Sequence, residues 1–200
     1  MALNIKEVLA AFRARKEMVR ELNALRKLVF YDELTGVLNR RGFRDEAEKA
    51  FRAVYPPARF RDRRSLLKLP FCVLFMDLDN FKHINDSFGH AVGDRVLKRT
   101  GVVLRKALRT EDLFGRWGGE EFVVALLGAR VAQAHMVAER IRRNVQHMNL
   151  KVLGRRVPTT ASIGLASHAK EKDLSELIRN ADKAMYQAKK KGKNRVIEFS

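Results

Sequence analysis

Arg116-Trp117-Gly118-Gly119-Glu120-Glu121-Phe122 is the stretch of sequence around which the fold is organised. Glu111 to Trp117 reads as a short strand, and the continuous apolar run from Phe122 to Leu127 reads as a buried one. The Gly-Gly pair between them permits positive φ and therefore a tight turn. The sequence predicts a β-hairpin at this position.

Glu120 and Glu121 leave this turn side by side. Like charges on neighbouring residues repel, and the apolar strand around them indicates partial burial, so a bound cation would neutralise them most simply. Gly118 and Gly119 have no side chains, and a bulky ligand could therefore approach their backbone closely. The alternative is an ordinary hairpin that carries two surface carboxylates.

Composition and charge narrow the class of protein. The chain has 200 residues, enough for one domain with a core and an appendage. Its net charge of +18 predicts an anionic partner: a nucleotide, a nucleic acid or an acidic membrane. The basic residues are spread through the chain, which disfavours a nucleic-acid-binding module. The longest apolar run, Pro70 to Met76, is too short to span a bilayer, and its Cys72 indicates a buried thiol in a reducing cytoplasm.

Residues 3–29 contain no Gly or Pro and predict one long helix. Its apolar residues follow a heptad spacing if Arg15 fills one position; they are Val8, Ala11, Met18, Leu22, Leu25 and Val29. About three heptads favour pairing with a second copy of the chain, and a helix that folds onto its own domain is the alternative. Gly36 follows the helix, and we place the boundary between a helical segment (1–30) and the main domain (31–200) before it.

The rest of the chain predicts an α+β fold, a central and mostly antiparallel sheet flanked by helices. Helices are expected near 40–55, 81–88, 91–108, 131–148 and 174–191. Strands are expected near 71–76, 111–117, 122–127, 151–153, 159–167 and 195–199. Residues 58–68 are expected to form a solvated basic loop.

Asp77 follows the apolar run 71–76, where an acidic residue has no packing role. We expect it to meet the two hairpin glutamates at a metal site. Asp79 is expected to cap the following short helix, a role that Asn80 could also fill. Oxygen ligands without a nearby His or Cys pair favour Mg²⁺ or Mn²⁺ over zinc. With a glycine turn in a basic chain, they indicate a nucleoside triphosphate and phosphoryl or nucleotidyl transfer.

Lysines are the candidate phosphate ligands, because the sequence has no Gly-x-x-x-x-Gly-Lys-Ser/Thr loop. Lys82 lies shortly after Asp77, and Lys189 and Lys193 lie near the end of the last predicted helix. A lysine in that position also interacts with the helix dipole, which is its alternative role.

Taken in order, these segments resemble the GGDEF family, the diguanylate cyclases. Gly118 to Phe122 resembles the motif that names the family, with glutamate at its third position. The similarity extends to four further segments, 32–41, 75–86, 89–94 and 181–195. It covers residues 31–199 and implies a ferredoxin-like, palm-type nucleotide cyclase domain, preceded here by the long N-terminal helix.

The resemblance implies that two GTP molecules are condensed to cyclic di-GMP with release of two pyrophosphates. Each domain would hold one GTP, and two domains would face each other as an antiparallel homodimer. By the family pattern, Asp77 and Glu121, with the carbonyl of Leu78, hold Mg²⁺ or Mn²⁺, two ions per active site. Glu120 would be the base or a second metal contact, and the sequence leaves the division between the two glutamates open.

Substrate contacts are implied in the same way. Asn85 and Asp94 would read guanine, whose N1–H and N2–H donors suit a carboxylate acceptor. His90 and the backbone of Gly118 and Gly119 are further substrate contacts. Three lysines would neutralise the phosphates: Lys82, Lys189 and Lys193. At the last of them the family often has arginine, and lysine keeps the charge without the bidentate fork.

Arg109 and Asp112 lie just before the hairpin, at the spacing of the family's product-inhibition site. Arg140 falls where the family has a secondary contact with that product. A catalytically inactive cyclic di-GMP receptor is the alternative function. Such a receptor usually has a damaged hairpin motif, whereas all five positions are intact here.

Overall fold

The computed structural model describes residues 5–55, 69–168 and 173–200. Seven strands and six helices lie in these ranges: α1 (Ile5–Phe30), α2 (Arg40–Val54), β1 (Phe71–Leu78), α3 (Phe81–Phe88), α4 (His90–Ala107), β2 (Leu113–Gly118), β3 (Glu121–Leu127), α5 (Val131–Gln146), β4 (Lys151–Val152), β5 (Arg155–Arg156), β6 (Ala161–Ser167), α6 (Leu174–Lys190) and β7 (Val196–Glu198). The basic loop predicted for 58–68 lies outside the described residues.

The main sheet has five strands in the order β2-β3-β1-β6-β7. Every pairing in it is antiparallel except that of β6 with β7, which is parallel. The α+β class and the mostly antiparallel sheet are therefore confirmed. The central strand β1 is buried at every position, as its uninterrupted apolar sequence predicts. The two-residue strand β5, which pairs with β4 in a separate small hairpin, was not predicted.

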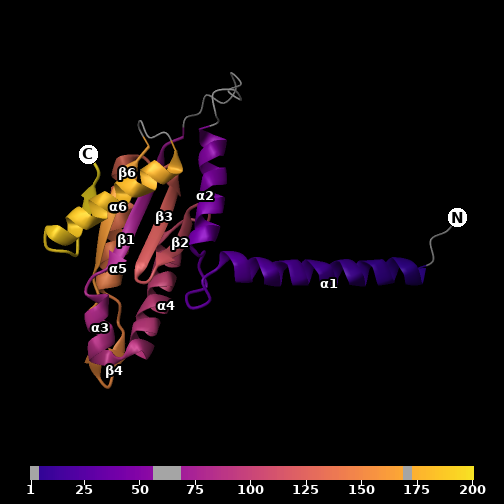
Figure 1. Cartoon of the computed structure of the whole chain (residues 1–200), viewed down its shortest axis with the longest axis horizontal. Helices are drawn as coiled ribbons and strands as arrows, with labels where there is room; N and C mark the ends of the chain where they lie inside the picture. The colour runs from indigo at the N-terminus through magenta and orange to yellow at the C-terminus, as the bar shows by residue number, and fades with distance from the viewer. Residues whose placement is uncertain (1–4, 56–68, 169–172) are drawn as a thin grey trace.

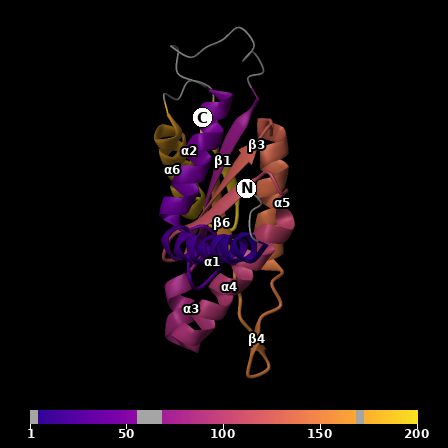
Figure 2. The same cartoon turned by 90° about the vertical axis from the view of Figure 1, so that its right-hand side faces the viewer.

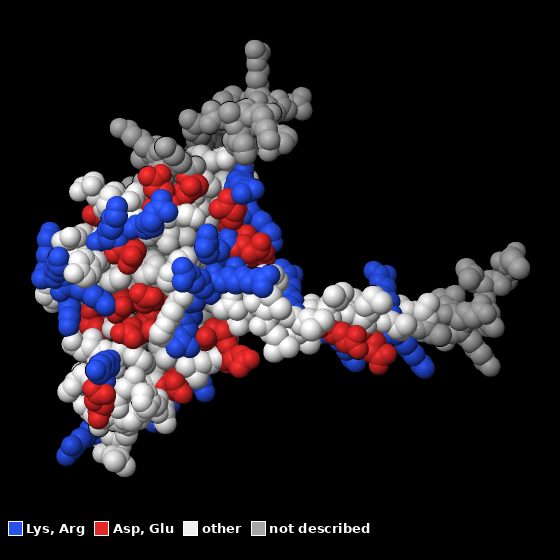
Figure 3. All heavy atoms as spheres, viewed as in Figure 1, with Lys and Arg blue, Asp and Glu red and all other residues white. Residues whose placement is uncertain are grey.

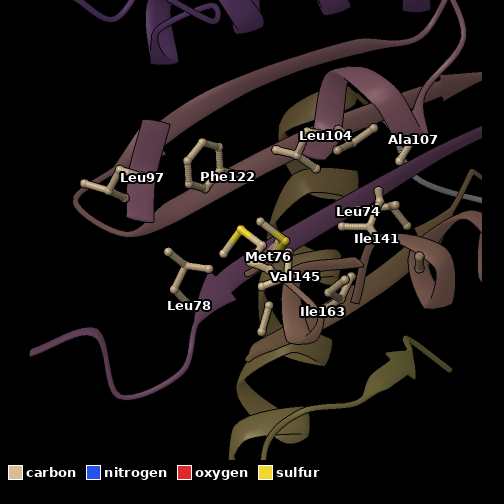
Figure 4. Close-up of a cluster of buried hydrophobic side chains, with 14 of the residues drawn as sticks. Leu74, Met76, Leu78, Leu97, Leu104, Ala107, Phe122, Ile141, Val145 and Ile163 are labelled. Carbon is tan, nitrogen blue, oxygen red and sulfur yellow. The ribbon is translucent and has the colours of Figure 1, made fainter. Parts of the chain in front are cut away.

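Helices cover both faces of the sheet (Figures 1 and 2). On one face Leu74 and Met76 of β1 pack in a cluster with residues of α4 and α5, part of which Figure 4 shows. On the other face Val73 and Phe75 pack with residues of α2 and α6. The period-two alternation of a strand thus places Asp77, two residues beyond Phe75, on the face that α6 covers.

Gly164 brings α6 close to the sheet. A Cβ at this position of β6 would overlap the backbone of Ala181 and Met185 in α6. Only glycine therefore allows this approach. At its N-terminus α6 is capped by Asp173, whose side chain accepts a hydrogen bond from the backbone N–H of Glu176. The helix then runs over β6 and β1 and delivers its last turn beside Asp77.

The first helix, α1, projects away from the body of the molecule (Figure 1). Several of its apolar side chains are exposed, with Met18 at 63%, Leu22 at 59% and Leu25 at 58% relative exposure. Folding of α1 onto its own domain, the alternative considered for the sequence, is therefore contradicted. Among its described residues, those at the C-terminal end are tied to the body, where Arg26 pairs with Glu46 of α2 at 3.3 Å.

Cys72 is fully buried, as expected, and burial raises the pKa of its thiol. Lys and Arg are interspersed with Asp and Glu on the face seen in Figure 3, over both the body and α1. Among the described residues, no helix has the length and apolar character needed to cross a lipid bilayer.

Candidate active site

The pairing of β1 with β3 brings two carboxylates together. Asp77 lies directly opposite Glu121 in the antiparallel register. Directly opposed residues of such a pair point to the same face, and like charges placed there destabilise the sheet. Glu120 is the residue before Glu121, at the turn that joins β2 and β3. The sequence prediction that Asp77 meets the hairpin glutamates is consistent with this register.

Burial makes the ionised form of these carboxyl groups energetically unfavourable. Asp77 is 4% exposed, and its burial raises the pKa of the carboxyl, while neighbouring Lys189 acts in the opposite direction. The pKa values of Glu120 and Glu121 are also raised, first by burial and then by the charge of Asp77. Asp182 of α6 adds to this effect on both Asp77 and Glu121. A cation at this place would stabilise all of them.

In the structure Lys189 supplies part of that positive charge. Its Nζ lies 2.7 Å from Oδ2 of Asp77. The other carboxylate oxygen, Oδ1, is buried and has no hydrogen-bond partner among the described residues. An orphaned buried carboxylate oxygen is a suitable ligand for a hard divalent cation. Within the described part of the chain, no three or more His, Cys, Asp and Glu side chains are arranged to hold an ion by themselves. A bound ion would complete its coordination with other oxygen ligands, such as backbone carbonyls, water or substrate oxygens.

The glycine turn differs from its prediction in one respect. Neither Gly118 nor Gly119 has a positive φ, so the turn does not depend on the left-handed conformation that was expected. The absence of side chains on these glycines instead leaves room beside the backbone of the turn. A Cβ on Gly118 would lie 3.0 Å from Oε2 of Glu121, and a Cβ on Gly119 would have no described atom within 4 Å. The backbone of the turn is consequently open to a ligand.

Arg116 holds the turn in place. Its Nε and Nη2 donate to the carbonyl of Gly119 at 3.0 and 2.7 Å. Its Nη1 donates to both oxygens of Asp32, at 3.3 and 3.1 Å, and this residue follows α1 by two positions. Asp32 also accepts bonds from the N–H and hydroxyl of Thr35. One guanidinium thus joins the segment after α1 to the hairpin turn.

Asp79 is not the helix cap that the sequence suggested. It is 3% exposed and accepts hydrogen bonds from the hydroxyls of Thr160 and Ser162. The N-cap position of α3 belongs to Asn80, whose side chain makes no capping hydrogen bond. Instead, Asn80 Oδ1 accepts a 2.5 Å hydrogen bond from Nζ of Lys193. Lys193 thereby lies next to the end of β1.

The two candidate guanine contacts lie on adjoining helices. Asn85 of α3 packs against Gly93 of α4, where a Cβ would collide with the Asn85 side chain. Asp94 is the next residue of α4 and is exposed, while Asn85 is half-buried. His90 at the start of α4 and Lys82 in the first turn of α3 are exposed as well. All of them lie in α3 or in the first two turns of α4, the helices that follow β1.

The candidate product-inhibition residues lie at the other end of β2. Asp112 precedes Leu113, the first residue of that strand, whereas Gly118 ends it. The Asp112 carboxylate accepts a 3.0 Å hydrogen bond from the backbone N–H of Arg109, and burial raises its pKa. Arg140 of α5 donates to the carbonyl of Ala107. The loop after α4 therefore brings these three residues into one region, away from the glycine turn.

Sequence reasoning missed several partners. Three contacts between residues far apart in sequence were not predicted. They join Asp77 to Lys189, Arg116 to Asp32, and Asp79 to Thr160. Asp182 was also missed; its position seven residues before Lys189 on α6, two helical turns away, was the available signal.

Buried Asp77 thus faces half-buried Glu121 beside a glycine turn, with Lys189 at its carboxylate, and this is the arrangement to compare with known proteins. The family model described as "Diguanylate cyclase, GGDEF domain" matches residues 29–195. The chain belongs to the GGDEF family.

Individual relatives agree. "Probable diguanylate cyclase DgcT" of Escherichia coli K12 is 34% identical over 179 residues, which are 88% of this chain and 37% of that protein. The crystal structure of the coiled coil and GGDEF domain of DgcB from Caulobacter crescentus, in complex with c-di-GMP, superposes with a TM-score of 0.80 at 26% identity, covering 98% of this chain and 100% of that one. An active GGEEF domain of a diguanylate cyclase from Vibrio cholerae gives 0.70 at 31% identity, covering 81% and 97%.

These neighbours confirm the palm-type cyclase fold expected from the resemblance. The chain spans 34% to 41% of the length of the first curated relatives it matches.

Proposed function

We propose that this chain is a diguanylate cyclase, which condenses two GTP molecules into cyclic di-GMP and releases two pyrophosphates. One observation carries the proposal: buried Asp77 has an oxygen without a described partner and faces Glu121, which follows an open turn of two glycines. A divalent cation and a triphosphate would satisfy such a site. The relatives named diguanylate cyclases support the same reaction.

The proposed metal ligands are the carboxylates of Asp77 and Glu121 and the carbonyl of Leu78, with Glu120 as a further contact. Mg²⁺ commonly binds through one or two carboxylates and completes its coordination with water and substrate phosphates. We propose Mg²⁺ or Mn²⁺, two ions per active site. When bound, these ions would neutralise charge on the reacting phosphate groups.

In the proposed reaction the 3′-hydroxyl of one GTP attacks the α-phosphate of the other. A new P–O bond forms, pyrophosphate leaves, and a second such step closes the ring. Glu120 is our candidate for accepting the hydroxyl proton. Burial raises its pKa above the ordinary value, which makes it a stronger base than an exposed glutamate. Glu121, which lies opposite Asp77, is proposed as a metal ligand and not as the base.

Guanine would be bound between α3 and α4. Asn85 and Asp94 offer an amide and a carboxylate on adjoining helices, and guanine presents N1–H and N2–H donors that adenine lacks as a pair. His90 is a further contact at the start of α4. The phosphates would be neutralised by Lys82 of α3, Lys189 in the last turn of α6 and Lys193 in the turn after it. GTP is therefore preferred to ATP in this proposal.

Two copies must meet, because one site holds one GTP. We propose an antiparallel homodimer that brings the two sites face to face. The exposed apolar side chains of α1 support a coiled coil between the copies, with 1–30 as the dimerising segment and 31–200 as the catalytic domain. The similar DgcB structure likewise comprises a coiled coil and a GGDEF domain. A cytoplasmic location, where GTP is available, belongs to the proposal.

Product inhibition is the last part of the proposal. Arg109 can donate to phosphate or to a guanine edge, and Asp112 can accept from guanine. Arg140 is tied to the end of α4 and is the third candidate contact. The DgcB structure contains c-di-GMP, the product expected here.

Turnover of GTP with Mg²⁺ tests the function. We expect cyclic di-GMP from the wild-type chain and none from Asp77→Ala or Glu120→Ala. Full turnover by either variant would contradict the site assignment. If the wild-type chain binds cyclic di-GMP through Arg109 and Asp112 but never forms it, the inactive receptor replaces the cyclase.

A further inference from the structure

Asp79 is an acceptor for hydrogen bonds from two separate parts of the chain. Thr160 and Ser162, at the start of β6, donate their hydroxyls to it at 2.8 and 2.6 Å. From the other side, the backbone N–H of Asn194 donates to Oδ2 at 3.0 Å. This third donor belongs to the turn after α6. Asp79 therefore joins the end of β1, the start of β6 and that turn.

Asp77 and Asp79 are two residues apart, but their carboxylates differ in how many hydrogen bonds they accept from the protein. An ionised carboxylate offers about four lone-pair positions, and Asp79 uses three of them for protein donors. Asp77 has one oxygen that no described residue contacts. A metal ion would find a free oxygen on Asp77, whereas on Asp79 it would compete with the bonds that hold the turn.

The turn after α6 needs such support. Gly192, Lys193 and Asn194 have φ values of 106°, 61° and 45°, which is a run of left-handed residues. For the two that are not glycine, this conformation is unfavourable, and it persists only where the surroundings fix it. Asp79 fixes the backbone of Asn194.

A second anchor holds the same turn from α5. Arg142 Nη1 donates to Oδ1 of Asn194 at 2.7 Å. The guanidinium is itself held by Glu139, at 3.0 to 3.2 Å, and its side chain is only 14% exposed. The turn is thus gripped at the backbone by Asp79 and at the Asn194 side chain by Arg142.

The hydrogen bonds from Asn194 to Asp79 and from Arg142 to Asn194 fix the position of the neighbouring residue, Lys193. It lies between Gly192 and Asn194, and its Nζ reaches Asn80, the residue after Asp79. We propose that Asp79 is a positioning residue: it locks the turn 192–194 so that the Lys193 ammonium is held at the end of β1 for the substrate phosphates. The inference rests on the proposed function for the identity of the anion, a nucleoside triphosphate.

A double-mutant cycle between Asp79 and Lys193 tests the proposal. Asp79→Asn removes the charge and one acceptor at nearly constant size. We expect it to raise the KM for GTP by about tenfold, with a much smaller change in kcat, because displacement of a binding group by about 1 Å can cost far more than that. In a Lys193→Met background the same change should alter KM by less than about twofold.

The opposite results would overturn the proposal. An equal fold-change from Asp79→Asn with and without Lys193 would show that Asp79 does not act through it. A shift in the Mg²⁺ concentration for half-maximal turnover would identify Asp79 as a metal ligand instead.

A second pair of variants tests the same proposal without changing buried Asp79, in case Asp79→Asn misfolds. Arg142→Met leaves Asp79 intact and removes the side-chain anchor of Asn194. Arg143→Met is its control, because Arg143 pairs with the same Glu139 at 3.5 Å and its side chain is 69% exposed. We expect Arg142→Met to raise the KM for GTP and Arg143→Met to leave it unchanged. An equal effect of the two would contradict the proposal.

Binding of a fluorescent, non-hydrolysable GTP analogue separates this inference from the proposed function. If the wild-type chain makes no cyclic di-GMP, the same cycle is measured on the Kd for the analogue. Coupling between Asp79 and Lys193 in that Kd supports the positioning role even without turnover, and independent effects overturn it.

Discussion

The guanidinium of Arg116 lies 3.1 Å from the carboxylate of Asp32, and its other edge binds the carbonyl of Gly119. Both partners of this ion pair are largely shielded from solvent, with side-chain exposures of 18% and 21%. We expect a change in the segment that follows α1 to act directly on the glycine turn. Through this contact the segment after the projecting helix is joined to the candidate active site.

Arg116→Lys should lower turnover and stability together. Lysine keeps the charge but cannot bind Asp32 and Gly119 at the same time with a planar fork. We expect kcat to fall about tenfold and the free energy of unfolding to fall by about 1–3 kcal/mol, measured by steady-state kinetics and denaturant unfolding. Arg52→Lys is the control, since its pair with Glu48 lies on the exposed side of α2. Wild-type turnover in Arg116→Lys would refute the coupling.

Lys189 and a divalent cation should compete for Asp77. The ammonium lies 2.7 Å from one carboxylate oxygen, so its removal leaves more negative charge for an ion. We expect Lys189→Met to bind Mn²⁺ about tenfold more tightly without nucleotide, which corresponds to about 1.4 kcal/mol, and to bind GTP more weakly. Titration calorimetry on the free protein measures both affinities.

The matched control for that experiment is Lys190→Met. Lys190 is exposed, and its Nζ lies over the ring of Tyr186 rather than at the carboxylates. Weaker or unchanged Mn²⁺ binding in Lys189→Met would show that the lysine does not occupy the cation's place.

The helix α1 should set how activity depends on protein concentration. Without residues 1–29, two domains must meet by diffusion, so specific activity should rise more steeply with concentration. Leu25→Arg, on the predicted seam and 58% exposed, should have the same effect, measured by activity and light scattering. Leu28→Arg is the control, because Leu28 is 66% exposed but lies off that seam. An unchanged dependence in the truncated chain would reject a dimerising role.

Arg109 and Asp112 should carry inhibition by added product. Arg109→Ala or Asp112→Ala should raise the half-inhibitory concentration of cyclic di-GMP by about tenfold or more, the loss expected for a hydrogen bond to a charged group. Initial rates at increasing product concentration give this value. Thr110→Ala, an exposed change in the same loop, should leave it unaltered. Unchanged inhibition in both variants would place the inhibitory contact elsewhere.

The parts of the site that sequence could predict depend on local periodicity. Asp77 and Glu121 were expected to meet because a buried strand and a hairpin each place a carboxylate at an end, and the β1–β3 register confirms that they face each other. Asp79 was misassigned because helix capping is a local rule, whereas its donors lie 81 to 115 residues further along the chain. Likewise, Arg116 and Asp32 are 84 residues apart, and nothing in their neighbourhoods signals the pair.

The glycine turn shows a different limit. A Gly-Gly pair is compatible with left-handed φ, yet neither residue uses it, and the open space beside Gly119 is visible only once the strands are paired. Of the two reasons that the sequence offered for glycine, positive φ is wrong, and close approach of a ligand to the backbone is consistent with the open space at Gly119.

The stoichiometry of one reaction tests the central claim most directly. The wild-type chain is incubated with GTP and Mg²⁺, and cyclic di-GMP and pyrophosphate are quantified together, with ATP as a parallel substrate. Two pyrophosphates should appear for each cyclic di-GMP, with no cyclic product from ATP. Pyrophosphate or phosphate release without cyclic di-GMP, or the same product from Asp77→Ala, would contradict the account.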